Sequence, residues 1–187
     1  MDFLTFLEGL SLKGNINISD ETLYSISHLQ YLKELDLNGC RKITNSGIHS
    51  LFRLNLKRIS LNGLNRLTNS IFDSINIQNL EVLDIGMTNI DCAQCLLKYD
   101  LSNIGSLSLT NTNITDEILE VLAKSRNLKF LSICLCPNIT NIGLNYLKST
   151  HSLDNLMLTL NPISSDAVLK LQTEYLIRSQ NVDILIL

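Results

Sequence analysis

A six-residue pattern, Leu-x-x-Leu-x-Leu, recurs along nearly the whole chain with aliphatic residues at its fixed positions. The pattern starts at Leu7, Leu32, Leu56, Leu80, Ile104, Leu128, Leu153 and Val182. Successive starts are 25, 24, 24, 24, 24, 25 and 29 residues apart, so six consecutive intervals agree within one residue. Such regularity indicates a protein built from repeated units, none of which can bury its apolar face alone.

Each pattern is followed by the same order of residue types. A compact residue, in most repeats small and polar, comes first, then an aliphatic residue, then a residue whose side-chain oxygen suits the start of a helix. The expected helix N-caps are Ser19, Thr44, Thr68, Asp91, Thr115, Thr140 and Ser164. Apolar residues then recur at helical spacing, as in Ile118, Leu119 and Leu122. Each repeat is therefore predicted to form one short strand and one helix of about two turns.

Stacking such units predicts a curved solenoid. Adjacent strands lie about 4.8 Å apart, whereas packed helices need about 8–10 Å between their axes. The strands must therefore take the inner, concave side and the helices the outer, convex side. The last interval of 29 residues leaves room for a longer helix, over roughly 165–179, before a final strand.

Two segments carry a family resemblance. LKELDLNGCRKITNSGIHSL (32–51) and LKFLSICLCPNITNIGLNYL (128–147) resemble the cysteine-containing leucine-rich repeats, which are of the ribonuclease-inhibitor-like and F-box-protein type. The resemblance implies an α/β fold, namely a right-handed horseshoe solenoid of about seven to eight repeats of 24–25 residues. It also places Cys40 and Cys136 at the family's structural turn position. We expect one domain over residues 1–187, with no nucleotide or other cofactor.

Composition restricts the class of partner. The net charge of −3 and pI near 5.6 argue against a protein that mainly binds nucleic acid. No apolar run is long enough to span a membrane, and the first residues do not resemble a secretory signal. We expect a cytoplasmic or nuclear protein with no membrane association.

The non-core residues of the strands map the expected concave face, because side chains alternate along a strand. At the strand exits stand Gly14, Gly39, Gly63, Met87, Asn111, Leu135 and Leu160. Apolar side chains gather toward the carboxyl end, which is typical of an interface, and charged ones toward the amino end. The predicted partner-binding residues are Val82, Met87, Phe130, Cys134, Leu135, Met157, Leu160, Ile184 and Ile186, together with Glu34, Asp36 and Arg58.

Two cysteine arrangements invite chemical interpretations. Cys92 and Cys95 form a CxxC motif after a predicted helix cap, which could lower a thiol pKa, but the register places Cys95 in the core. A zinc site would need Cys134 and Cys136 as well, and the register puts the two pairs on opposite sides of the core. The three histidines lie in separate repeats. We therefore predict neither catalytic residues nor a metal site.

The sequence thus predicts a non-catalytic protein-interaction module that binds a partner protein through its concave strand face. The resemblance adds two alternatives: a substrate-recognition or adaptor part of an F-box-type ubiquitin-ligase assembly, in which the F-box itself would be absent, or a pathogen effector. A redox enzyme built on Cys92 and Cys95 is the opposing class. A further alternative is a structural homodimer joined through the apolar edge Ile184–Leu187.

Overall fold

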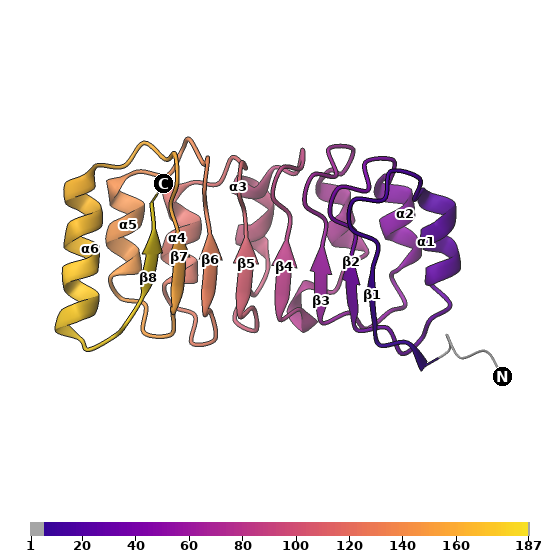
Figure 1. Ribbon diagram of the computed structural model, residues 1–187, viewed down its shortest axis with the longest axis horizontal. Helices are drawn as coiled ribbons and strands as arrows, with labels where there is room; N and C mark the ends of the chain where they lie inside the picture. The colour runs from indigo at the N-terminus through magenta and orange to yellow at the C-terminus, as the bar shows by residue number, and fades with distance from the viewer. Residues whose placement is uncertain (1–5, 187) are drawn as a thin grey trace. The chain divides into compact units, whose positions relative to one another are not determined.

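The computed structural model describes residues 6–186, in which eight parallel three-residue strands follow one another in chain order (Figure 1). The chain divides into two compact units on either side of the Ile90–Asp91 bond. In each unit neighbouring strands pair, and helices cover one face of the sheet. The single domain expected over the whole chain stays a prediction.

Unit 1, up to Ile90, contains four strands and the helical segments between them. In chain order these are β1 (Gly9–Ser11), α1 (Asp20–Ile26), β2 (Glu34–Asp36), α2 (Asn45–Ser50), β3 (Arg58–Ser60), η2 (Asn69–Asp73), η3 (Ile77–Asn79) and β4 (Val82–Asp84). Unit 2, from Asp91, has the same plan. It contains α3 (Cys92–Cys95), η4 (Leu96–Lys98), β5 (Ser106–Ser108), α4 (Asp116–Leu122), β6 (Phe130–Ser132), α5 (Asn141–Leu147), β7 (Asn155–Met157), α6 (Ser165–Ile177) and β8 (Asp183–Leu185).

The core consists of the repeated leucines. Leu32, Leu35 and Leu37 of one repeat are buried, as are Leu128 and Leu131 of another. From β1 to β4 and from β5 to β7, the middle residues of the strands pair as the pattern predicts: Leu35 lies opposite Ile59, for example. The βα repeat and its register are therefore confirmed for these strands.

All seven predicted N-cap residues directly precede a helix. The hydroxyl oxygens of Thr44, Thr140 and Ser164 accept hydrogen bonds from first-turn amides, at 3.2, 3.1 and 3.2 Å. The long helix expected over roughly 165–179 is α6. The caps thus mark where each strand-exit turn gives way to a helix.

The helices of the third and fourth repeats differ from the two-turn helices that the pattern predicts. After Thr68 the chain forms the 3₁₀ segments η2 and η3, and after Asp91 it forms only the four-residue α3 followed by η4. The sequence from Asn69 to Asn76 is rich in Ser, Asn and β-branched Ile, which have weak helix propensity. Burial of Ile71 and Phe72 holds the segment in place without a full α-helix.

The predicted register of the last strand is wrong by one residue. Ile184 pairs with Leu156 in the core column, and Leu185 pairs with Met157. A shift of one residue exchanges the two faces of a strand, so Ile184 belongs to the core column and not to the concave face. Ile186, which follows β8, falls on the same side as Ile184 by alternation but is 51% exposed. The turn after α6 sets this register: Ser179 is left-handed, and the Gln180 side chain donates to the Leu153 carbonyl at 2.8 Å. Leu187, the end of the predicted dimer edge, lies outside the described residues.

Candidate functional site

The strand exits share one backbone conformation. Positive φ angles between 53° and 76° occur at all seven predicted exit positions: Gly14, Gly39, Gly63, Met87, Asn111, Leu135 and Leu160. The conformation directs the backbone N–H toward the next repeat. Leu135 N donates to Thr159 O at 2.9 Å, as Gly39 N donates to Asn62 O at 2.9 Å. The repeat therefore demands a left-handed residue at this point.

Three exit positions meet this demand with large apolar side chains. A left-handed residue that carries a Cβ costs about 1–2 kcal/mol, which glycine avoids. Met87, Leu135 and Leu160 nevertheless stand there, with exposed fractions of 46%, 38% and 70%. Leu160 gains little burial to offset this cost. Strain of this kind, at an exposed apolar residue, is a pointer to function.

In unit 2 the two leucines extend an apolar surface on the sheet. Phe130 of β6 and Met157 of β7 are half-buried on the face of the sheet opposite the core. Leu185 of β8 lies directly opposite Met157 and is 48% exposed. We call Phe130, Leu135, Met157, Leu160 and Leu185 the unit 2 apolar face. Leu185 is not among the residues predicted from the sequence, because the predicted register of β8 is wrong by one residue. In the sequence, glycine at three of the seven exit positions indicates a left-handed backbone there. By alignment of the repeats, the same conformation is expected at Leu135 and Leu160.

Cys134 does not contribute to this face. The register predicted that it points to the concave surface, but its side chain is only 8% exposed, and Ser132 Oγ lies 3.8 Å from its Sγ. Ser132 itself is buried, and its Oγ lies 2.8 Å from Thr110 Oγ1 of the preceding repeat.

The charged residues predicted in unit 1 do lie together. Glu34, Asp36, Arg58 and Val82 line a shallow hollow of about 430 Å³ over β1 to β4. Arg58 Nε lies 3.6 Å from Glu34 Oε1. Asp36 accepts a hydrogen bond from Ser11 Oγ at 3.2 Å. The hollow thus presents polar groups that are held by their neighbours and open to solvent.

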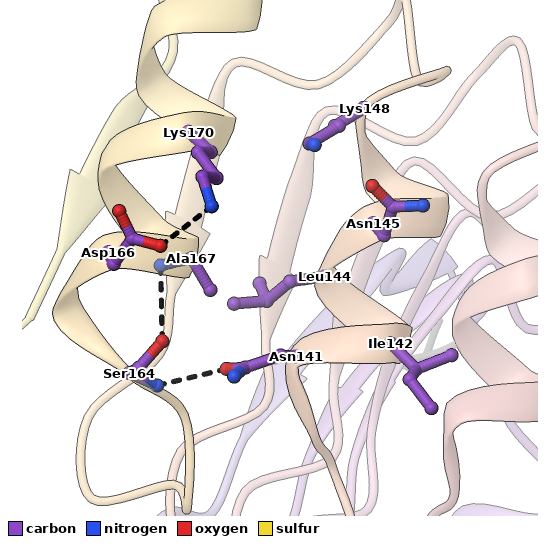
Figure 2. Close-up of a pocket in the computed structure, with 9 residues that line it drawn as sticks. All are labelled: Asn141, Ile142, Leu144, Asn145, Lys148, Ser164, Asp166, Ala167 and Lys170. Atoms are coloured by element: carbon purple, nitrogen blue, oxygen red, sulfur yellow. Dashed lines mark hydrogen bonds and ion pairs between the residues drawn. The ribbon is translucent and has the colours of Figure 1, made fainter.

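A second hollow, of about 420 Å³, lies between α5 and α6 (Figure 2). Its polar groups serve the helices themselves. Asn141 Oδ1 accepts from Ser164 N at 2.9 Å, Ser164 Oγ accepts from Ala167 N at 3.2 Å, and Lys170 pairs with Asp166 at 2.7 Å. These contacts fix the start of α6, so we assign this groove a structural role.

The cysteines are all buried. Burial raises the pKa of the Cys92 thiol to about 12, which outweighs the lowering effect of a hydrogen bond with Thr112. Cys95 occupies a core position, as the register predicted. A redox CxxC site needs an accessible thiol of lowered pKa, and Cys92 has neither property.

Cys40 and Cys136 hold the strand-exit turn. Cys40 Sγ lies 3.1 Å from the carbonyl oxygen of Leu12 in the preceding repeat, and Cys136 Sγ lies 3.2 Å from that of Leu109. Asn161 takes the same role through its amide, which donates to Ile133 O at 2.7 Å. These side chains satisfy backbone groups of the loop, as predicted from the sequence.

Among residues 6–186 no helix is long and apolar enough to cross a membrane. In the same part of the chain, no three His, Cys, Asp or Glu side chains gather in a way that could hold a metal ion.

Comparison with solved structures supports the architecture. The crystal structure of the Rad7 and Elc1 complex in yeast contains a chain that matches with a TM-score of 0.65 and 18% identity, over 82% of this chain and 43% of that one. The fold is a leucine-rich-repeat solenoid. Internalin C2 from Listeria monocytogenes matches with a TM-score of 0.49 and 23% identity, over 95% of this chain and 60% of that one. The chain thus spans less than two thirds of either structure. No protein-family model and no curated protein matches it.

Proposed function

We propose that this protein is a non-catalytic interaction module that binds a partner protein on the unit 2 apolar face. The observation that carries the proposal is the pair Leu135 and Leu160. Each holds an exposed apolar side chain in a backbone conformation that glycine would adopt at lower cost. Folding stability gives no reason to keep leucine there, whereas binding a partner does.

The composition of the face supports the same function. Aromatic residues and methionine are enriched in the centres of protein interfaces. Phe130 and Met157 stand on the strands that lead to the exit leucines, and Met157 lies directly opposite Leu185 of β8. The solved neighbour of similar fold was crystallised as a complex of two proteins, Rad7 and Elc1. Glu34, Asp36 and Arg58 of unit 1 remain proposed contacts, whose charges would set orientation and association rate more than affinity. Val82 and Met87 of the same unit remain proposed apolar contacts.

Finer assignments follow from the sequence resemblance. Membership of the cysteine-containing subclass is proposed on the turn cysteines Cys40 and Cys136. A role as an adaptor in an F-box-type ubiquitin-ligase assembly, or as a pathogen effector, is proposed on the same resemblance, as is a cytoplasmic or nuclear location. The identity of the captured partner distinguishes these roles.

A homodimer joined through the Ile184–Leu187 edge is the second candidate, and exposed apolar side chains on α6 and directly after β8 support it. Leu169, Leu176, Ile177 and Ile186 are all exposed. Light scattering tests this candidate, because a monomer at high micromolar concentration would contradict it.

The experiment for the main proposal is affinity capture from a lysate of the source organism, read by mass spectrometry. Wild type is compared with Leu135→Gly/Leu160→Gly, which removes both side chains and relieves the backbone. The matched control is Asn111→Gly, a left-handed exit residue of the same unit with a polar side chain. We expect proteins that are retained by wild type and by the control but lost with the leucine variant. Equal capture by all three would contradict the proposal.

A further inference from the structure

A basic hollow lies in unit 2 near the starts of the strands, apart from the exit leucines. It has a volume of about 450 Å³, and its walls are the segments that follow α4 and α5. Lys124, Arg126, Lys129 and His151 contribute to its lining, and serines supply much of the rest. All four basic side chains are exposed, in a protein whose net charge is −3.

Part of this positive charge has no counterpart. Lys124 Nζ lies 3.1 Å from Glu120 Oε1, and Lys129 Nζ lies 3.7 Å from Asp154 Oδ2. Within residues 6–186, the Arg126 guanidinium and the His151 imidazole have neither an ion pair nor a hydrogen bond. The hollow therefore offers an unpaired cation to an anionic ligand.

The backbone of the hollow indicates which anion fits. Phosphate sites commonly use free amides at a helix N-terminus or in a nest. Here the N–H groups of Lys124, Ser125 and Lys129 already donate to Val121, Leu122 and Gly105 carbonyls. The segments also follow helix C-termini, which carry partial negative charge. Only side chains would therefore bind the anion. Because their positive charges are spread over two segments, they match separate carboxylates along a peptide better than one compact phosphate.

The hollow also adjoins the unit 2 apolar face. Lys129 directly precedes Phe130, the first residue of β6, and its ion-pair partner Asp154 directly precedes β7. A segment that crosses the start of β6 would meet the basic side chains first and Phe130 next.

We propose that this basic hollow binds an acidic segment, a run of Asp or Glu side chains, of the protein that docks on the unit 2 apolar face. The charge of the hollow alone indicates that the segment is acidic. That the segment is part of the docked partner rests on the proposed function. The interaction would orient the partner and raise its association rate, and its strength would fall with ionic strength.

The test uses a synthetic peptide of consecutive glutamates with a neutral fluorophore, titrated by fluorescence anisotropy at low ionic strength. Arg126→Glu/Lys129→Glu should weaken binding about tenfold, because two attractive charges become repulsive. The matched control is Lys42→Glu/Lys170→Glu, which makes the same change in net charge. Within residues 6–186 it likewise alters one cation without an ion pair, Lys42, and one with an ion pair, Lys170. It should weaken binding less than about twofold. Arg126→Ala removes a side chain that makes no ion pair or hydrogen bond within residues 6–186, so it should weaken binding by a smaller factor without affecting the fold.

Three results would overturn the proposal: no binding of the glutamate peptide by wild type at low ionic strength, equal weakening in both double variants, or displacement of the peptide by an equal concentration of inorganic phosphate. The last would assign the hollow to phosphate. Leu135→Gly/Leu160→Gly should bind the glutamate peptide like wild type. The titration therefore tests the hollow independently of the apolar face.

Discussion

Asp116 binds Thr140 of the next repeat through both of its carboxylate oxygens. Oδ1 accepts from the backbone N of Thr140 at 2.8 Å, and Oδ2 accepts from its hydroxyl at 2.6 Å. Gly143, in the first turn of α5, packs against the same carboxylate: a Cβ added there would overlap Asp116 Oδ1 and approach Leu119 Cδ1 to 2.9 Å. The first residue of one helix thus fixes the cap of the next, and a glycine makes room for it.

Unit 1 repeats this arrangement with Asp20, Thr44 and Gly47. Thr44 donates to Asp20 at 2.8 and 2.6 Å, and a Cβ at Gly47 would overlap Asp20 Oδ1. The glycines in these two helices therefore serve the contact between repeats. They are an exception to the rule that glycine within a helix is replaced by alanine with a gain in stability.

We expect Gly143→Ala to lower the free energy of unfolding by about 1–3 kcal/mol. The energetic cost of the overlap with Asp116 should exceed the gain in helix propensity of about 1 kcal/mol. Urea denaturation followed by circular dichroism measures the change. Asn145→Ala, at an exposed position of the same helix, is the control and should be neutral or slightly stabilising. The double variant Asp116→Ala/Gly143→Ala should lose less free energy of unfolding than the sum of the losses in the two single variants. A Gly143→Ala protein more stable than wild type would refute this account of α5.

Leu160→Gly should raise the free energy of unfolding by up to about 1 kcal/mol. Glycine relieves the left-handed strain but adds freedom to the unfolded chain, so the net gain is smaller than the strain itself. Little burial is lost, since Leu160 is largely exposed. Chemical denaturation measures the change in the free energy of unfolding. Leu158→Gly is the comparison, because loss of that core leucine should lower the free energy of unfolding by several kcal/mol. A clear loss of stability in Leu160→Gly would mean that the side chain contributes to the fold.

The protein should lose stability as the pH rises from about 9 toward 12. Burial raises the pKa of Cys92 from 9.0 to about 12 in the folded protein, so the unfolded chain ionises first and is favoured in this interval. Below pH 9 the thiol is neutral in both states and its contribution is constant. Unfolding free energies measured across this range should decline less steeply for Cys92→Ala. An unchanged slope would show that Cys92 is not the group responsible.

Alkylation provides a separate check on the same thiol. Cys92 in the folded protein should resist iodoacetamide at neutral pH, because only the thiolate reacts and the side chain is buried. Rapid modification of Cys92 in the native state would revive the redox interpretation of the CxxC motif.

The repeat made most of the fold predictable. The leucines and the seven N-caps set the strands and the helix starts, because one period combines a strand pattern with a cap. The register of β8 was not predictable in this way. The run from Ile184 to Leu187 is aliphatic throughout, so no polar residue marks the outward face. The Gln180 contact that sets the register joins residues 27 apart in sequence.

The repeat likewise made one candidate surface predictable and left the other unpredicted. The glycines at the strand exits indicated a left-handed position in sequence, and Leu135 and Leu160 followed from it by alignment. The basic hollow depends on the segments after α4 and α5 lying side by side, and neither Arg126 nor His151 belongs to a repeated column. Such a surface appears only when the repeats are stacked in space.

The most direct test of the interaction surface is the dissociation constant of a captured partner, measured by calorimetry. Wild type, Leu135→Gly/Leu160→Gly and Asn111→Gly should be compared after denaturation curves have shown that all three fold. We predict that the leucine variant binds at least about tenfold more weakly, although it is no less stable, and that Asn111→Gly stays within about twofold of wild type. Equal dissociation constants for wild type and the leucine variant would show that the partner binds elsewhere.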